Sequence, residues 1–332
     1  MNKITLEEDA QEKYTHSYKK IQLAKKEINS LVFGQSEVID QIFITLLSRG
    51  HALIIGLPGL AKTRIVNFIG IILGLNTKRI QFTPDLMPND ILGNEILDDS
   101  SKNSNFFRFL KGPVFSQLLL ADEINRASPR TQSALLQSMQ EKKVTVAGKN
   151  YDLPSPFHVL ATQNPIDQEG TYPLPEAQLD RFLMNIKISY PKLEAEKEIL
   201  ILSNKDLDKE PAKILDFEDL LKYQSIAKSL PVGESIFKYI LDIINNSRPE
   251  TTNIKSIKEN VLWGPSPRAS LSLLATSKSK AFLEKRFSPS IMDVKSLVKP
   301  ILMHRLHLNI SAKADGVLVE DLISDLLERI NV

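Results

Sequence analysis

The segment GLPGLAKT, residues 56–63, constrains the fold more than any other part of the chain. It follows the apolar stretch ALII and precedes the helical stretch RIVNFIGIIL, so the order is strand, glycine-containing loop, helix. A loop in this position is typical of phosphate sites in α/β proteins. The alternative is a strand-to-helix turn that binds nothing. The strict pattern GxxxxGK followed by Ser or Thr fails at one position, because Ala61 replaces the last glycine.

The residues of this loop suit a polyphosphate. Glycines let backbone N–H groups close around phosphate oxygens, and the N-terminus of the following helix adds partial positive charge. Lys62 would neutralise charge on the β- and γ-phosphates, and Thr63 would offer its hydroxyl to Mg²⁺. The predicted nucleotide site therefore comprises Gly56, Leu57, Pro58, Gly59, Leu60, Ala61, Lys62 and Thr63.

Short apolar stretches predict five buried strands of one mostly parallel sheet, at residues 51–55, 78–82, 115–121, 158–162 and 184–189. The segment SPRTQSALLQSMQE between two of them predicts a helix, with Ser128 as N-cap and Pro129 in the first turn. A surface helix over 14–31 is expected to cap the core. Alternation of strand and helix predicts an α/β core over residues 1–192.

After Pro191 the pattern becomes helical. Four segments carry helical periodicity, at 193–206, 216–230, 234–248 and 266–283. No low-complexity linker precedes them. We therefore expect an all-helical second domain, residues 193–332.

Two adjacent carboxylates, Asp122 and Glu123, follow the third predicted strand. Such a pair alone is often a solvated helix start. Here both the pair and the loop follow buried strands, whose carboxyl ends meet at one edge of a parallel sheet. We expect Asp122 to hold Mg²⁺ through water, together with Thr63, and Glu123 to polarise the water that attacks the γ-phosphate.

Three further polar residues could complete this site. Asn164 follows the strand over 158–162 and could orient the attacking water, although Asn before Pro is by itself more often a turn residue. Arg181 ends PEAQLDRF and Arg268 ends GPSPR, and either arginine alone is typical of a surface charge. Together with the loop and the acidic pair, they suggest one guanidinium from a neighbouring subunit and one from the second domain.

Two segments predict hairpins inserted into the core. Residues 92–113 contain the turn-rich sequence GNEILDDSSKNSN, and residues 143–153 have Gly148 at a turn. The second hairpin carries basic residues that a ring would aim at its pore, although basic turns are usually only solvated: Lys142, Lys143 and Lys149.

Composition narrows the partners and the location. Lys and Arg number 42 and Asp and Glu 40, a formal charge of +2, which favours neither nucleic acid nor an anionic membrane. There is no cysteine, and no apolar run reaches the roughly 18 residues of a membrane span, so we expect a cytoplasmic protein without membrane insertion. His304 and His307 lie in MHRLHL, which reads as helical, but no carboxylate or cysteine cluster accompanies them. That favours a structural role over a metal site.

Four stretches together resemble the MoxR family of AAA+ ATPases: GLPGLAKT, LLLADEINRASPRTQSALLQSMQE, ATQNPIDQEGTYPLPEAQLDRF and GPSPRAS. The resemblance extends from about Val32 to Ser270. That family also has alanine at the position of Ala61. The resemblance implies an AAA+ P-loop NTPase core with a helical lid, and ATP with Mg²⁺ as the bound nucleotide.

The resemblance also implies a role for each candidate residue. Residues 56–63 match the Walker A loop and Asp122-Glu123 match Walker B. The remaining matches are Asn164 as sensor 1, Arg181 as the arginine finger, Arg268 as sensor 2, and Val32 and Phe33 beside the adenine. The two hairpins resemble the helix-2 insert and the hairpin before sensor 1. The active form would be a homo-oligomeric ring, expected to be a hexamer.

Three functions remain open at this stage. MoxR-like proteins typically act with partners carrying von Willebrand factor A domains, so the first is chaperone-like remodelling, maturation or metal insertion of such a client. The second is a nucleic-acid translocase that uses the hairpin lysines on phosphates, which the near-balanced charge disfavours. The third is a nucleotide-gated scaffold without turnover, which the presence of Glu123 and Arg181 disfavours.

Overall fold

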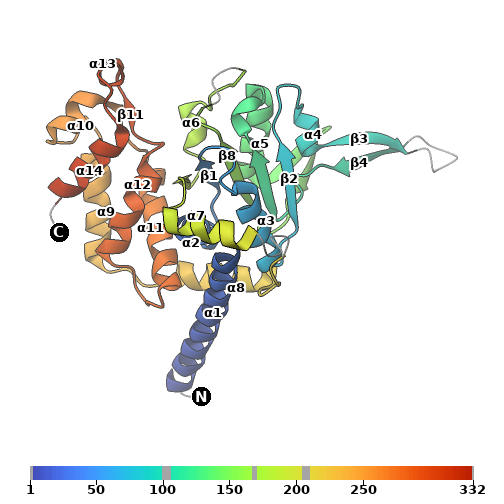
Figure 1. The fold of residues 1–332 in the computed structure, drawn as a ribbon, viewed down its shortest axis with the longest axis horizontal. Helices are drawn as coiled ribbons and strands as arrows, with labels where there is room; N and C mark the ends of the chain where they lie inside the picture. The colour runs from blue at the N-terminus through green and yellow to red at the C-terminus, as the bar shows by residue number, and fades with distance from the viewer. Residues whose placement is uncertain (1–2, 99–105, 167–169, 204–209, 331–332) are drawn as a thin grey trace.

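The computed structural model describes residues 3–98, 106–166, 170–203 and 210–330. Within these ranges an α/β core lies beside a mainly helical lid, as Figure 1 shows. The predicted fold class, a parallel sheet flanked by helices and followed by a helical lid, is confirmed.

The core contains one five-stranded sheet in the order β2-β5-β8-β1-β9, in which all neighbours are parallel. Its strands lie within three residues of the predicted ends: β1 (Ala52–Ile55), β2 (Thr77–Gln81), β5 (Leu118–Asp122), β8 (His158–Gln163) and β9 (Met184–Lys187). The prediction that all five are buried is wrong for β2. It lies at an edge of the sheet and exposes Lys78, Arg79 and Gln81.

The apolar residues of the central strands serve two faces, because successive side chains of a strand point to opposite sides. In β5, Leu118 and Leu120 join the core cluster shared with the first helices and the lid. Leu119 and Ala121 join the cluster on the other face, together with Leu135. Because both faces of the sheet are covered, ligands can reach it only at the ends of its strands, and in parallel sheets they bind at the carboxyl ends.

The core helices are α1 (Lys3–Leu31), α2 (Ser36–Leu47), α3 (Lys62–Ile72), α4 (Pro88–Leu92), α5 (Pro129–Glu141) and α6 (Glu176–Leu179), with a 3₁₀ turn at Ile124–Arg126. The predicted cap of α5 is confirmed, since the Ser128 side chain accepts a hydrogen bond from Thr131 N. None of the described helices combines the length and the apolar character needed to span a membrane.

Both predicted hairpins are present as two-stranded ribbons. One pairs β3 (Gly93–Asp98) with β4 (Phe106–Lys111) and projects away from the lid in Figure 1. Its turn-rich tip, residues 99–105, lies outside the described residues. The other pairs β6 (Lys143–Val146) with β7 (Lys149–Asp152) through a turn in which Ala147 and Gly148 both have positive φ.

The predicted helical segments of the lid are found as α7 (Leu193–Ser203), α8 (Phe217–Ser229), α9 (Glu234–Asn246) and α11 (Pro267–Leu283). The lid also contains α10 (Lys255–Asn260), α12 (Ile291–Leu302), α13 (Ile310–Ala314) and α14 (Val319–Arg329). To the all-helical domain that was expected, the structure adds one short antiparallel pair, β10 (Val261–Trp263) with β11 (His307–Leu308).

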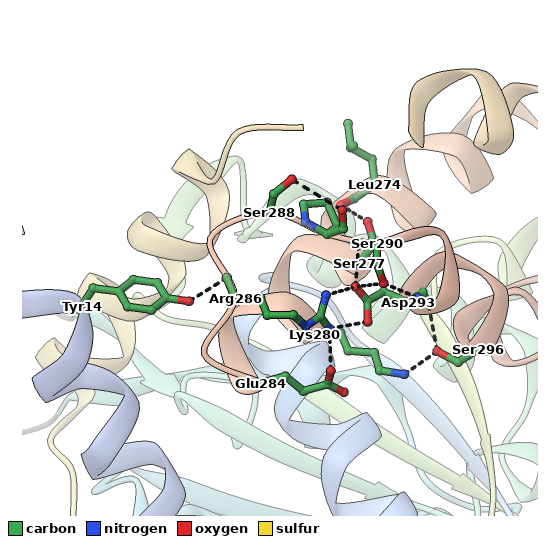
Figure 2. A network of polar contacts seen from close by, with 11 residues as sticks. Tyr14, Leu274, Ser277, Lys280, Glu284, Arg286, Ser288, Ser290, Asp293 and Ser296 are labelled. Atoms are coloured by element: carbon green, nitrogen blue, oxygen red, sulfur yellow. Dashed lines mark hydrogen bonds and ion pairs between the residues drawn. The ribbon is translucent and has the colours of Figure 1, made fainter. Parts of the chain in front are cut away.

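Helix α1 connects the core to the lid and packs more deeply than a surface cap. Ile21, Ala24 and Ile28 on its apolar face are fully buried. In the first half of this helix, the Tyr14 hydroxyl donates to the carbonyl oxygen of Arg286, at 2.8 Å (Figure 2). The Arg286 guanidinium in turn donates to both carboxylate oxygens of Asp293, at 2.6 Å each. Helix α1 therefore contacts a loop of the lid that this ion pair holds in place.

Candidate functional site

The loop of residues 56–61 leaves the carboxyl end of β1 and enters α3. Gly56 N donates to Gln163 O at 3.2 Å, which ties the start of the loop to the end of β8. A Cβ at Gly56 would lie 2.0 Å from Ile188 Cγ2, so the close approach of the next strand requires glycine. Gly59 and Ala61 have φ of +82° and +58°. Ala61 therefore adopts the left-handed conformation that a glycine in this position would accept more easily.

Lys62, the first residue of α3, is held inside this loop. Only 9% of the residue is exposed, and its Nζ donates a 2.6 Å hydrogen bond to Gly56 O. The ammonium group thus lies at the mouth of the loop, beside the N-terminus of a helix. Both features attract anions.

Asp122 ends β5 and faces Thr63. Its Oδ2 accepts hydrogen bonds from Thr63 Oγ1 at 3.2 Å and from Arg79 Nη2 at 2.8 Å, and its Oδ1 accepts one from Thr162 Oγ1 at 2.5 Å. Burial acts to raise the pKa of Asp122, but the hydrogen bonds from Thr162, Arg79 and Thr63 outweigh it, so the pKa lies below its ordinary value. Asp122 is therefore a carboxylate at neutral pH.

Glu123 has a φ of +57°, an uncommon conformation for a residue other than glycine. Its N–H donates to Thr162 Oγ1 at 2.9 Å, which holds the backbone in this turn. Its carboxylate accepts from Gln81 Nε2 at 2.7 Å and lies 3.1 Å from Arg126 Nε. The turn directs Glu123 out of the strand, beside Asp122 and at the same edge of the sheet.

Asn164 follows β8, between the loop and the acidic pair. It is buried, and its Oδ1 accepts a 3.3 Å hydrogen bond from Ile166 N. Asn164 thus forms a turn and also lies at the edge where β1, β5 and β8 end, so its role toward the attacking water stays a prediction.

Val32 and Phe33 lie beside the loop although they come from the end of α1. Together with Gly59 and Ala61 they line a cavity of about 180 Å³, which Pro191 and Ile199 close from the start of the lid segment. The cavity is mostly apolar. This placement suits a flat base next to a phosphate-binding loop.

Arg181 and Arg268 lie elsewhere, at the opposite end of the sheet. Leu183 N donates to His51 O just before β1 begins, whereas the phosphate loop starts where β1 ends. The four residues of β1 separate the two ends by about 13 Å, at about 3.3 Å per residue. Arg181 and Arg268 line a second cavity of about 330 Å³, which has no residue in common with the first.

Several residues around these sites were not predicted. Arg79 and Gln81 on β2 contact the two carboxylates, and Thr162 on β8 contacts Asp122 and the backbone of Glu123. Asp180, which precedes Arg181, lies 3.8 Å from Arg268. The sequence could have indicated Arg79 and Gln81, because these polar residues alternate with the buried Ile80 and therefore lie on one face of the strand.

The helical interpretation of MHRLHL is wrong, because α12 ends at Leu302. His304 is buried and its Nε2 lies 3.0 Å from Phe182 O, in agreement with the structural role that was favoured. His307 lies in β11, with its Nδ1 3.1 Å from Glu176 Oε1. In the part of the chain that the structure describes, no group of three or more His, Cys, Asp or Glu side chains could hold a metal.

The residues at the loop fit a magnesium nucleotide. Mg²⁺ prefers oxygen ligands and is usually held by one or two protein groups together with phosphate and water. Thr63 and Asp122 offer such oxygens side by side. Gly59 leaves its surroundings open, since a Cβ there would meet nothing within 4 Å.

Two family models match the chain. The family described as "ATPase family associated with various cellular activities (AAA)" matches residues 51–184, and the AAA lid domain matches residues 255–326. A crystal structure of a candidate ATPase from Cytophaga hutchinsonii superposes with a TM-score of 0.90 at 39% identity and covers 98% of both chains.

Curated relatives agree with this. Chaperone MoxR1 of Mycobacterium tuberculosis is 40% identical over 92% of this chain and 80% of its own length. YeaC of Bacillus subtilis is 36% identical over 93% of each chain, and protein MoxR of Paracoccus denitrificans is 26% identical over 86% of this chain and 88% of its own. With the strand order, the loop and the acidic pair in place, the chain belongs to the MoxR family of AAA+ ATPases.

Proposed function

We propose that the chain hydrolyses ATP with Mg²⁺ at the edge of the sheet where β1, β5 and β8 end. One observation carries the proposal: Thr63 and Asp122 lie within 3.2 Å of each other, next to the buried Lys62 and to Glu123. The division into a core of residues 1–192 and a lid of residues 193–332 belongs to the same proposal.

The side chains divide the work. Lys62 binds the β- and γ-phosphates, and Thr63 and Asp122 hold the metal, which supplies charge neutralisation at the phosphates. Glu123 polarises the attacking water and Asn164 orients it. Val32 and Phe33 pack against the adenine.

Arg181 and Arg268 act on a neighbouring subunit's nucleotide. Both lie at the end of β1 that is remote from the phosphate loop of their own chain, which supports action across a subunit boundary. The sequence left open whether Arg268 acts on its own nucleotide or on a neighbour's, and its position beside Asp180 at the remote end of the sheet supports the neighbour's. A ring, expected to be a hexamer, presents one edge of each subunit to the loop of the next.

The work done by hydrolysis is chaperone-like remodelling or maturation of a cytoplasmic protein with a von Willebrand factor A domain, including metal insertion. Support comes from the relative named as a chaperone. The client is tested by adding such a protein in purified form, and it should change the ATPase rate and bind in a nucleotide-dependent manner. A set of purified domains that neither bind nor alter the rate would argue against this client class.

Hydrolysis is tested with two variants of the full chain. Glu123→Gln should still bind a fluorescent ATP analogue, because Lys62, Thr63 and Asp122 remain, yet release almost no phosphate. Lys62→Ala should lose binding. Glu141→Gln, which changes an exposed carboxylate at the end of α5, is the matched control and should behave as the parent. Equal turnover in the parent and Glu123→Gln would remove Glu123 from its role.

A nucleic-acid translocase is the second candidate function, because Lys142 and Lys149 are exposed at the β6–β7 hairpin. We expect no saturable DNA or RNA binding at physiological salt. Binding with a steep salt dependence that disappears when Lys142, Lys143 and Lys149 are neutralised would favour the translocase instead.

A further inference from the structure

All three nitrogens of the Arg305 guanidinium, just after α12, donate hydrogen bonds within the protein. Only 3% of the residue is exposed. Its Nε donates to Asp180 Oδ1 at 2.7 Å, and its Nη2 donates to Phe182 O at 2.8 Å. Its Nη1 donates to Leu183 O at 3.2 Å and to Ile301 O at 2.6 Å. The lid side chain is therefore bonded to three residues of one core segment and to the end of α12.

These acceptors lie on both sides of Arg181. Asp180 precedes it, and Phe182 and Leu183 follow it. The neighbouring His304 adds a contact of 3.0 Å from Nε2 to Phe182 O. The short segment that carries Arg181 is therefore fixed before and after the arginine by side chains of the lid.

Asp180, which forms an ion pair with Arg305, also contacts the helix that carries Arg268. Asp180 Oδ2 accepts a 3.0 Å hydrogen bond from Ser266 Oγ, the N-cap residue of α11, and lies 3.8 Å from Arg268 Nη1. Arg268 is the second residue of that helix. One carboxylate thus links the segment bearing Arg181, the helix bearing Arg268 and the buried Arg305.

The core also holds this segment, because Phe182 is fully buried and Arg181 Nη1 donates to Leu136 O at 2.8 Å. Asp180 and Arg305 both line the cavity of about 330 Å³ that contains the two arginines, and both also line a cavity of about 300 Å³ on the other side, beside Glu176 and His307. With cavities on two sides of Asp180 and Arg305, the directed hydrogen bonds of Arg305 add to the packing of Phe182 in setting the position of the segment.

We propose that Arg305 is a positioning residue for the arginines that act on the neighbouring subunit, and that it works through Asp180 and the backbone flanking Arg181. The inference rests on the role of Arg181 and Arg268 proposed above. A planar guanidinium suits this position because it donates in several fixed directions at once, which a lysine ammonium cannot match.

The test is the variant Arg305→Gln in the full chain. ATP affinity should stay as in the parent, because the phosphate loop lies at the other end of the sheet. The kcat should fall on the order of 10²-fold, the loss expected when a catalytic group is misplaced by about 1 Å. Arg305→Lys keeps the buried charge without the planar geometry and should lose less.

Mixing experiments tell positioning from general damage. An Arg305→Gln subunit keeps Glu123, and a Glu123→Gln subunit keeps well-placed arginines, so mixed rings contain some complete interfaces and should regain activity. Arg305→Gln mixed with Arg181→Ala should regain none, because both subunits are defective on the same side. Arg286→Gln, which breaks an ion pair within the lid, is the control and should lower thermal stability without changing kcat.

The outcomes separate the two proposals. If Arg181→Ala and Glu123→Gln fail to complement although mixed rings form, the proposed action across the boundary fails. If they complement but Arg305→Gln does not complement Glu123→Gln, or does complement Arg181→Ala, Arg305 has no positioning role on that side. Failure of Arg305→Gln, Arg305→Lys and Asp180→Asn alike to fold and assemble would also overturn the inference, since the ion pair would then be needed for the fold itself.

Discussion

Arg79 Nη2 donates a 2.8 Å hydrogen bond to Asp122 Oδ2, the same oxygen that accepts from Thr63 Oγ1. The same Nη2 also donates to Gln81 Oε1 at 2.8 Å, and Gln81 Nε2 donates to Glu123 Oε2 at 2.7 Å. One run of hydrogen bonds along β2 therefore joins both carboxylates. A guanidinium occupies the oxygen that faces Thr63, where it would compete with a bound metal.

Replacing Arg79 should lower the Mg²⁺ concentration that half-saturates nucleotide binding. In Arg79→Gln the competing cation is gone, while Asp122 stays ionised at pH 7 because Thr162 and Thr63 still donate to it. Arg79 donates to Asp122 Oδ2 from both Nε and Nη2. Loss of about 1.5 kcal/mol of this charge-assisted contact corresponds to at least about a tenfold lower half-saturating Mg²⁺ concentration. The measurement is a Mg²⁺ titration of the binding of a fluorescent nucleotide.

The neighbouring Lys78→Gln is the control for Arg79→Gln, since Lys78 is an exposed cation on the same strand. It should leave the titration unchanged. An unchanged or higher half-saturating concentration in Arg79→Gln would show that Arg79 does not compete with the metal.

Gly56 should show an energetic coupling to Ile188 that Gly59 lacks. A Cβ at Gly56 would lie 2.0 Å from Ile188 Cγ2, whereas a Cβ at Gly59 would meet nothing within 4 Å. Gly56→Ala should cost about 1–3 kcal/mol through overpacking. Adding Ile188→Ala removes the clashing methyl. The double variant should therefore lose less stability than the two single variants together, by at least about 0.5 kcal/mol.

The same double-mutant cycle with Gly59→Ala should be additive. There the cost comes from the backbone, whose φ is +82°, and Ile188 has no part in it. Denaturant unfolding of the six proteins measures both cycles. Additivity in the Gly56 cycle would contradict the close approach of Ile188.

Stability should decrease as the pH falls below about 6.5. Burial lowers the pKa of His51 to about 3 and that of His158 to about 4, from an ordinary value of 6.5. Below pH 6.5 the unfolded chain therefore binds protons that the folded protein does not, so acid favours unfolding until the folded pKa values are reached. Each group contributes a slope of up to about 1.4 kcal/mol per pH unit.

Urea unfolding between pH 7 and pH 5 checks this, with His158→Gln as the variant. Its amide can still donate to Gly50 O, the partner of His158 Nδ1 at 2.8 Å, but it cannot titrate. We expect a shallower pH dependence than in the parent. An equal slope in both proteins would mean that His158 binds protons as readily in the folded state as in the unfolded state.

Much of the site could be predicted because each of its parts directly follows an apolar strand. The loop with Lys62 follows β1, Asp122 ends β5 just before Glu123, and Asn164 follows β8. Parallel strands bring those ends to one edge of the sheet whatever their order. Arg79 could not be found in this way. Its contact with Asp122 exists because β2 pairs with β5, and no local pattern gives the strand order.

The other failures have a similar cause. MHRLHL has helical spacing, yet tertiary hydrogen bonds from His304 and Arg305 to Phe182 O hold it in another conformation. Arg268 does lie in the lid, as expected, but local sequence could not place it beside Asp180, because that contact joins residues far apart in the chain. Which nucleotide it can reach follows only from the docking of the lid.

The last prediction concerns the ring itself. If Arg181 and Arg268 serve the next subunit, turnover per chain should be nearly zero at concentrations where the monomer predominates and should rise together with assembly, followed by mass photometry. An arginine supplied across a boundary is worth about 10³ to 10⁵ in rate, which is roughly 4–7 kcal/mol of barrier. Arg181→Ala should therefore bind ATP and assemble as the parent does, yet remain inactive at every concentration. Arg130→Ala, which removes an exposed arginine in the first turn of α5, should follow the parent curve. A turnover per chain that does not change from monomer to ring would mean that each site is complete within its own chain.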